Sequence, residues 1–222
     1  MEVIMFIDTL ESRTLLSASP VSQQVAADRL QVAAALTQFK SDCINTTLTL
    51  MADCDALKAA GLSSDTTLAP LFKQFHTDAK AMRASLKADN LAEDAAVLQD
   101  ESVIDTQLLK ILGDAGNPTQ RKADKAVLVQ DQIQLQTDEI AGLNSRLKTR
   151  KDDYTTLFND LSAIVTALGT DTNASPALQA AVNQFNTDRT NSLNTLANDL
   201  QTIINDRTNL VSALQAEEGT LT

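Results

Sequence analysis

Prolines and glycines divide this sequence into four long segments. Ser19-Pro20, Asn117-Pro118 and Ser175-Pro176 each place a capping side chain directly before a proline. This is a typical helix start, because the side chain accepts a free backbone N–H and proline has none to lose. Pro70 fits a first helical turn for the same reason, and glycines fall where the apolar periodicity stops, as C-terminal caps do. The pattern predicts helices over residues 20–60, 67–112, 118–168 and 176–218.

The third of these segments repeats apolar residues every seven positions, which is the pattern of helices that pack along a common seam. We expect the second segment to be less regular, with a stutter or bend at residues 87–90 and a stripe that restarts at Leu91, Ala95 and Leu98. The heptad positions of the third segment are Ala126, Ile133, Ile140, Leu147, Tyr154, Leu161 and Leu168, with Val129, Leu143, Leu157 and Ile164 at the companion position.

Short connections between long helices favour antiparallel neighbours. The sequence therefore predicts an all-α fold, an elongated antiparallel up-down-up-down four-helix bundle that forms one domain over residues 20–219. In this register Leu143 of the third helix should face Leu200 of the fourth, and Gln136 should lie near Arg207.

The charge and hydropathy of the chain restrict its partners. It has 18 Lys and Arg against 29 Asp and Glu, a net charge of −11. Nucleic acids and anionic membrane surfaces attract clustered cations, so this balance argues against both. No apolar run approaches the roughly 18 residues of a membrane-spanning helix. We expect no nucleic-acid partner, no transmembrane segment and no binding to membrane surfaces.

No pattern of catalytic or metal-binding residues stands out. His76 is the only histidine, and the sequence has no phosphate-binding loop, nucleophile elbow or calcium loop. Cys43 and Cys54 are eleven residues apart on one predicted helix, too far to pair with each other or share a zinc ion. They are interpreted as small buried side chains, with an intermolecular disulfide or a reactive thiol as the alternative. We expect no enzyme activity, no cofactor and no metal site, and interpret adjacent acids such as Asp152-Asp153 as a solvated surface.

Polar residues interrupt the predicted seams, and two interpretations are open. Buried polar layers can fix register and oligomeric state, whereas long side chains can also reach out of a narrow core into solvent. The second interpretation is favoured here. The residues concerned are Thr46, Asp53, Gln136, Arg150, Arg189 and Arg207.

A short motif recurs along the chain. Gln-Phe-x-Thr-Asp occurs at residues 74–78 and 184–188, and a variant with serine occurs at residues 38–42. Either an ancient duplication of a helical hairpin or chance in a biased composition explains this. In both cases we expect Phe75 and Phe185 in the core, with Asp78 and Asp188 beside the seam.

Residues 1–19 precede the first predicted helix and lack the basic start and long apolar run of a secretory signal. The stretch Leu-Glu-Ser-Arg-Thr-Leu-Leu-Ser-Ala at residues 10–18 resembles the LEPR-XLL motif of planctomycete and related bacterial proteins, with serine in place of proline at Ser12. That resemblance implies a sorting or processing tag of envelope-associated or extracellular proteins. A short amphipathic helix docked on the bundle is the alternative. The matching residues are Leu10, Glu11, Arg13, Leu15, Leu16, Ser17 and Ala18.

These observations favour a non-enzymatic structural or protein-interaction protein, a spacer or scaffold of the cell envelope or exterior. A homo-oligomer is compatible with this role, and the protein partner is unknown. The alternatives are an amphipathic lipid-binding bundle and a cytoplasmic adaptor or chaperone-like coiled coil.

Overall fold

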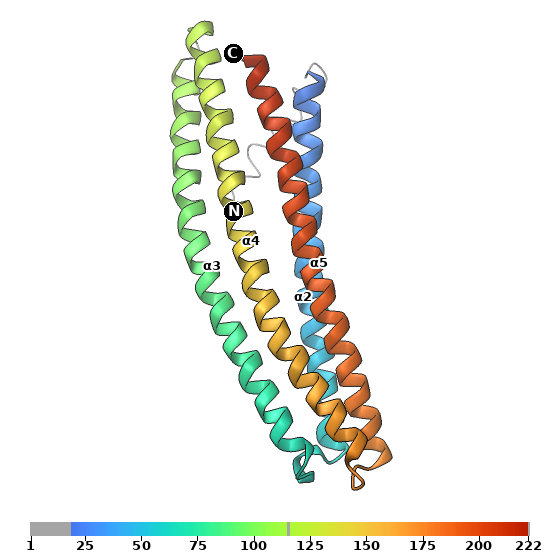
Figure 1. Ribbon diagram of the computed structural model, residues 1–222. Coiled ribbons are helices and arrows are strands. Elements are labelled where there is room, and N and C mark those ends of the chain that lie inside the picture. Colours follow the sequence, from blue (N-terminus) through green and yellow to red (C-terminus); the bar gives the residue numbers. More distant parts are fainter. Residues whose placement is uncertain (1–18, 115, 222) are drawn as a thin grey trace. The chain divides into compact units, whose positions relative to one another are not determined.

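Figure 1 shows the chain as a computed structural model. It describes residues 19–114 and 116–221, and for residue 86 and residues 88–95 it describes the backbone alone. Throughout these residues the regular structure is helical and contains no β-strand, so the all-α prediction is confirmed.

Four long helices and one short 3₁₀ helix make up the described chain. The long helices contain 40, 46, 53 and 46 residues in chain order, and their ends agree with the predicted bounds to within three residues. They are α2 (Pro20–Ala59), α3 (Leu68–Gly113), α4 (Pro118–Thr170) and α5 (Pro176–Leu221), with η2 (Leu62–Ser64) between α2 and α3.

The predicted helix caps are present as hydrogen bonds. The Oγ atoms of Ser19 and Ser175 accept backbone N–H groups three residues ahead, at 3.2 and 3.1 Å, and Asn117 Oδ1 accepts at 3.2 Å. Asp65 Oδ1 caps α3, because it accepts the N–H groups of Thr67 and Leu68 at 2.9 and 2.8 Å. Each long helix therefore starts where a side chain replaces the missing partner of a backbone N–H.

A left-handed glycine follows α2. Gly61 has a φ of 93°, a conformation that costs other residues strain, and its N–H donates to the carbonyl oxygen of Lys58 at 3.1 Å. This glycine is the stop signal that the sequence indicates.

Contacts divide the described chain into two compact units, and each long helix contributes to both. Unit 1 contains residues 19–34, 94–141 and 204–221, and unit 2 contains residues 35–93 and 142–203. The single-domain expectation for residues 20–219 stays a prediction.

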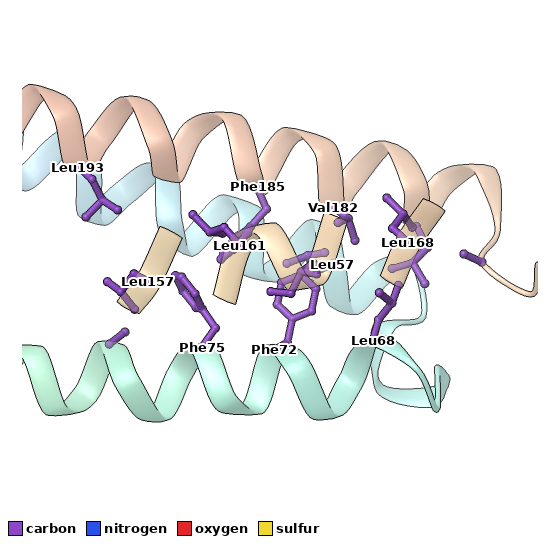
Figure 2. Packing of buried hydrophobic residues seen from close by; sticks show 14 of the residues in the cluster. Leu57, Leu68, Phe72, Phe75, Leu157, Leu161, Leu168, Val182, Phe185 and Leu193 are labelled. Atoms are coloured by element: carbon purple, nitrogen blue, oxygen red, sulfur yellow. The ribbon is translucent and has the colours of Figure 1, made fainter. Parts of the chain in front are cut away.

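Unit 2 holds a continuous apolar core that all four long helices supply (Figure 2). At its centre, Phe185 is fully buried and makes edge-to-face contacts with Phe72 and Phe75, both with ring centroids 5.2 Å apart. Leu57 of α2 and Leu161 of α4 belong to the same cluster and are 1% and 2% exposed. The expected core position of Phe75 and Phe185 is confirmed.

The interior of unit 1 mixes smaller apolar side chains with polar ones. Asp28, Gln107, Asp124 and Arg207 are all buried there. The apolar residues buried with them are Val25, Val32, Ile104, Val129, Ile204, Leu210, Ala213 and Leu214. Unit 1 therefore has fewer large apolar contacts than unit 2.

The predicted seam is confirmed for the companion positions of α4, all of which are buried. In the second half of α3 the prediction is wrong for Leu98, which is 65% exposed. The interior positions there are the half-buried Val97 and Asp100 and the buried Ile104 and Gln107, so the buried face has polar members and starts one residue earlier. The side chains of Leu91 and Ala95 lie outside the described residues.

Candidate functional site

The residues that resemble a sorting motif, Leu10 to Ala18, lie outside the described residues. Candidate chemistry in the described chain therefore comes from the helices. There, no group of three or more His, Cys, Asp or Glu side chains is placed to hold a metal ion.

The single histidine and the two cysteines lie on the helices of unit 2. His76 is exposed and touches the Phe75 ring edge-to-face, with centroids 6.1 Å apart. Neighbouring atoms nevertheless displace part of the water around its ring, and this desolvation is the largest cause that lowers the pKa of His76. The charges of Arg83 and Lys58 lower it further. Cys43 and Cys54 are half-buried and not joined by a disulfide within the described chain, and burial raises the pKa of both thiols.

The repeated Gln-Phe-x-Thr/Ser-Asp motif has the same local geometry in all three copies. In each copy the glutamine Nε2 donates to the aspartate four residues ahead, at 2.8 Å for Gln38–Asp42, 2.8 Å for Gln74–Asp78 and 2.7 Å for Gln184–Asp188. Gln134 and Asp138 make the same bond at 3.0 Å outside the motif. A glutamine and an aspartate four residues apart lie on the same helix face, which makes this bond possible.

These glutamine-bound aspartates face a second aspartate on a neighbouring helix. For each of these four aspartates the two carboxyl groups lie within hydrogen-bonding reach of each other, and we call these four contacts the carboxyl pairs. The carboxyl pairs are Asp53–Asp188 and Asp42–Asp199 between α2 and α5 and Asp78–Asp160 between α3 and α4, all in unit 2, and Asp100–Asp138 between α3 and α4 in unit 1.

One member of each carboxyl pair has a raised pKa. Burial is the largest cause for Asp53, Asp100, Asp160 and Asp199, and the facing carboxyl group adds to it. Both effects disfavour the charged form, since the ion loses water and meets a like charge. Asp53 is 6% exposed, so it is the most enclosed of the four.

A polar groove of about 200 Å³ gives two of the pairs access to solvent. It lies between α2 and α5 in unit 2 and is lined by Asp42 and Asp188 together with asparagine, serine and threonine side chains. Water can therefore reach the glutamine-bound member of both α2–α5 pairs.

The buried arginines contradict the expectation that long polar side chains reach out to solvent. Arg189 is 7% and Arg207 8% exposed. Arg207 Nη1 donates to Gln136 Oε1 at 2.6 Å and forms an ion pair with Glu139. The predicted proximity of Gln136 and Arg207 is confirmed. A carboxylate one helical turn from Gln136 holds the guanidinium inside unit 1.

The other seam arginines lie in unit 2. Arg189 Nη2 donates to the Thr46 carbonyl oxygen at 3.3 Å, and burial lowers the pKa of Arg189. Arg150 places its guanidinium 5.5 Å from the ring centroid of Phe39, within the range of a cation–π contact. Phe39 belongs to the third copy of the repeated motif and contacts a charge, whereas its counterparts Phe75 and Phe185 pack in the core.

Sequence reasoning missed the carboxyl pairs because it searched for acids adjacent in sequence. The available signal was the spacing Gln-x-x-x-Asp, which recurs on helix faces beside the seam. The alignment of neighbouring helices decides which second aspartate faces each glutamine-bound aspartate. The sequence of one helix does not contain this information.

Comparisons with protein-family models, with curated proteins and with solved structures found no match to this chain. None of the described helices combines the length and the apolar character needed to cross a membrane.

Proposed function

We propose that this chain is a non-enzymatic structural or protein-interaction protein, a spacer or scaffold, and that its long helices form an antiparallel four-helix bundle. Contacts within each unit support the antiparallel arrangement. In unit 2, Asp42 and Asp53 of α2 are eleven residues apart, and their partners Asp199 and Asp188 are eleven residues apart in the reverse direction.

Unit 1 supports the same arrangement for α3 and α4. Asp100 of α3 faces Asp138 of α4, and Asp114, fourteen residues later and directly after the end of α3, faces Asp124, fourteen residues earlier on α4. Between these two contacts the residue number rises on one side and falls on the other, as it does between antiparallel helices.

An exposed apolar face on α2 is the observation that carries the interaction role. Ile44, Leu48 and Met51 are 62%, 59% and 61% exposed, and their spacing of four and three residues places them on one side of the helix. Contiguous exposed apolar surface is a recurring feature of protein-contact sites. The inner face of α2 packs in the core through Leu57, whereas this outer face is exposed in the described part of the chain and offers a surface for a partner protein or a second copy.

Replacing this face tests the interaction role. The variant Ile44→Gln/Leu48→Gln/Met51→Gln is compared with Ala52→Gln/Ala56→Gln/Ala59→Gln, which changes an exposed neighbouring face of the same helix. Light scattering of the purified protein and pull-down from fractionated cells should show an assembly or partner that the first variant loses and the control keeps. Equal behaviour of both variants, or turnover of a substrate by the purified protein, would contradict the proposal.

The envelope or extracellular location is proposed from the resemblance of residues 10–18 to a sorting motif. Cell fractionation with N-terminal sequencing of the mature protein tests it. Recovery in the envelope or medium, lost when Arg13, Leu15 and Leu16 are replaced by alanine, supports the location. A cytosolic protein that starts at Met1 or Glu2 contradicts it.

A further inference from the structure

The four carboxyl pairs lack one hydrogen-bond donor each. Atom Oδ2 is buried and without a hydrogen-bond partner in Asp53, Asp100, Asp160 and Asp199, as far as the described residues extend. Each of these aspartates is the pair member that no glutamine reaches. Two carboxylates only accept hydrogen bonds, so neither can satisfy the other. One proton on the pair converts the contact into an O–H···O⁻ hydrogen bond, which is short and strong.

We propose that the interhelical carboxyl pairs are an acid-sensitive device: each pair takes up one proton as the pH falls, and the helices then pack more stably than at neutral pH. The glutamine contacts prepare this arrangement. Because Gln38, Gln74, Gln134 and Gln184 each hold one carboxyl group as an acceptor, its partner is the group that must supply the donor. The inference concerns helix packing and is independent of the proposed scaffold role.

The charged surroundings of the pairs are mostly negative. Asp138 faces Asp100 from α4, and Asp131 of the same helix adds a second negative charge. Asp78 faces Asp160 from α3, and Asp42 faces Asp199 from α2. The charges that raise the pKa of these three groups are all carried by aspartates, and Arg150 is the cation that acts, together with Asp199 and Asp42, on the nearby thiol of Cys43.

Asp53 is the exception because a cation lies beside it. Asp188 faces it from α5, and Arg189 of the same helix partly offsets the repulsion. Arg189 donates to the backbone oxygen of Thr46, so part of its hydrogen-bonding capacity is already used. Burial still outweighs this cation and keeps the pKa of Asp53 raised.

The direction of the pH effect follows from linkage between proton binding and folding. The pKa of the four aspartates is higher in the folded chain than in the unfolded chain. Their contribution to stability is therefore complete below the unfolded pKa of about 4 and is lost as the pH rises through the folded pKa. Many proteins show the opposite, since paired carboxylates with lowered pKa make them less stable in acid.

Urea unfolding of the full chain between pH 7.5 and pH 4.5, followed by circular dichroism, tests this device. The midpoint urea concentration of the native chain should rise as the pH falls. The variant Asp53→Asn/Asp100→Asn/Asp160→Asn/Asp199→Asn carries permanent amide donors in place of the protons. At pH 7.5 this variant should have a higher midpoint urea concentration than the native chain. Its midpoint should change between pH 7.5 and pH 4.5 by less than half as much as that of the native chain.

A matched control separates the pairs from the general effect of net charge, because acid also reduces the self-repulsion of a chain with charge −11. It removes four exposed acids instead, as Asp55→Asn/Glu101→Gln/Asp105→Asn/Asp152→Asn. The control should keep the native pH shift. The proposal is overturned if both variants lose the shift equally, or if the native midpoint falls on acidification.

Nuclear magnetic resonance titration of the side-chain carboxyl carbons gives a second, independent readout. One carboxyl per pair should titrate above the ordinary aspartate range in the native chain. Ordinary titration of all eight would overturn the proposal. An effect of calcium would also overturn it. If millimolar calcium raised the midpoint urea concentration at pH 7.5 in the native chain but not in the Asn variant, the pairs would hold a metal ion instead of a proton.

Discussion

Glu139 forms an ion pair with the buried guanidinium of Arg207 in unit 1. Replacing Glu139 should therefore destabilise the chain strongly. The side chains of Arg207 and Glu139 are 9% and 17% exposed, and Gln136 is the second acceptor of the guanidinium. The change Glu139→Leu leaves the Arg207 charge buried with one neutral acceptor. Breaking one side of a buried ion pair in this way costs about 3–5 kcal/mol.

The burial of both side chains decides the size of this effect. An exposed ion pair of the same composition contributes only about 0–1 kcal/mol, because water screens it and receives either charge when its partner is lost. Here water has little access to either side chain, so we expect a cost of about 3 kcal/mol, at the lower end of the buried range because Gln136 remains.

Urea unfolding measured by circular dichroism at constant pH determines this cost. The double variant Glu139→Leu/Arg207→Met removes both charges and should recover most of the lost stability, since an apolar pair of similar volume often replaces a buried ion pair without loss. A cost below about 1 kcal/mol for Glu139→Leu would show that Arg207 reaches solvent, and the reasoning from burial would be wrong.

Three further outcomes are expected. Phe185→Ala should cost about 3–5 kcal/mol in thermal unfolding, because it opens a cavity beneath two aromatic contacts, whereas Phe158→Ala at a half-buried position should cost clearly less. Asp65→Ala should cost about 1 kcal/mol because it removes the cap of α3, and Asp105→Ala, at an exposed position inside that helix, serves as the control. Amide hydrogen exchange should be slower at residues 157–168 of α4 than at residues 120–131, since the first stretch packs in the apolar core of unit 2; equal rates would contradict this.

The helix boundaries could be predicted because their signals are local. A serine or asparagine before a proline acts within four residues, so the caps at Ser19, Asn117 and Ser175 follow from the sequence alone. The companion positions of the α4 heptads were equally readable, since a seven-residue repeat leaves little freedom in which face is buried.

The polar contacts between helices could not be predicted to the same extent. An error of one residue in the phase of a helix turns a side chain by about 100°, which is why Leu98 was expected inside and is exposed. Arg207 was expected to reach solvent because a long side chain can extend out of a narrow core. Its actual partner, Glu139, comes from another helix.

The buried ion pair also favours one register between α4 and α5 in unit 1. Apolar seams with a seven-residue repeat look alike after a slip of seven residues, so burial alone distinguishes poorly between registers. Such a slip between α4 and α5 would move Arg207 from Gln136 and Glu139 to either Val129 and Gln132 or Leu143 and Arg146.

Neither slipped position provides a carboxylate, so each would leave a buried charge unpaired at a cost of about 3–5 kcal/mol. The double variant Glu139→Leu/Arg207→Met lacks this penalty. It should therefore stay as helical and nearly as stable as the native chain while losing its single register, which would be detected as additional amide peaks in the nuclear magnetic resonance spectrum. A single sharp set of peaks from that variant would assign the register to the apolar packing and the carboxyl pairs instead.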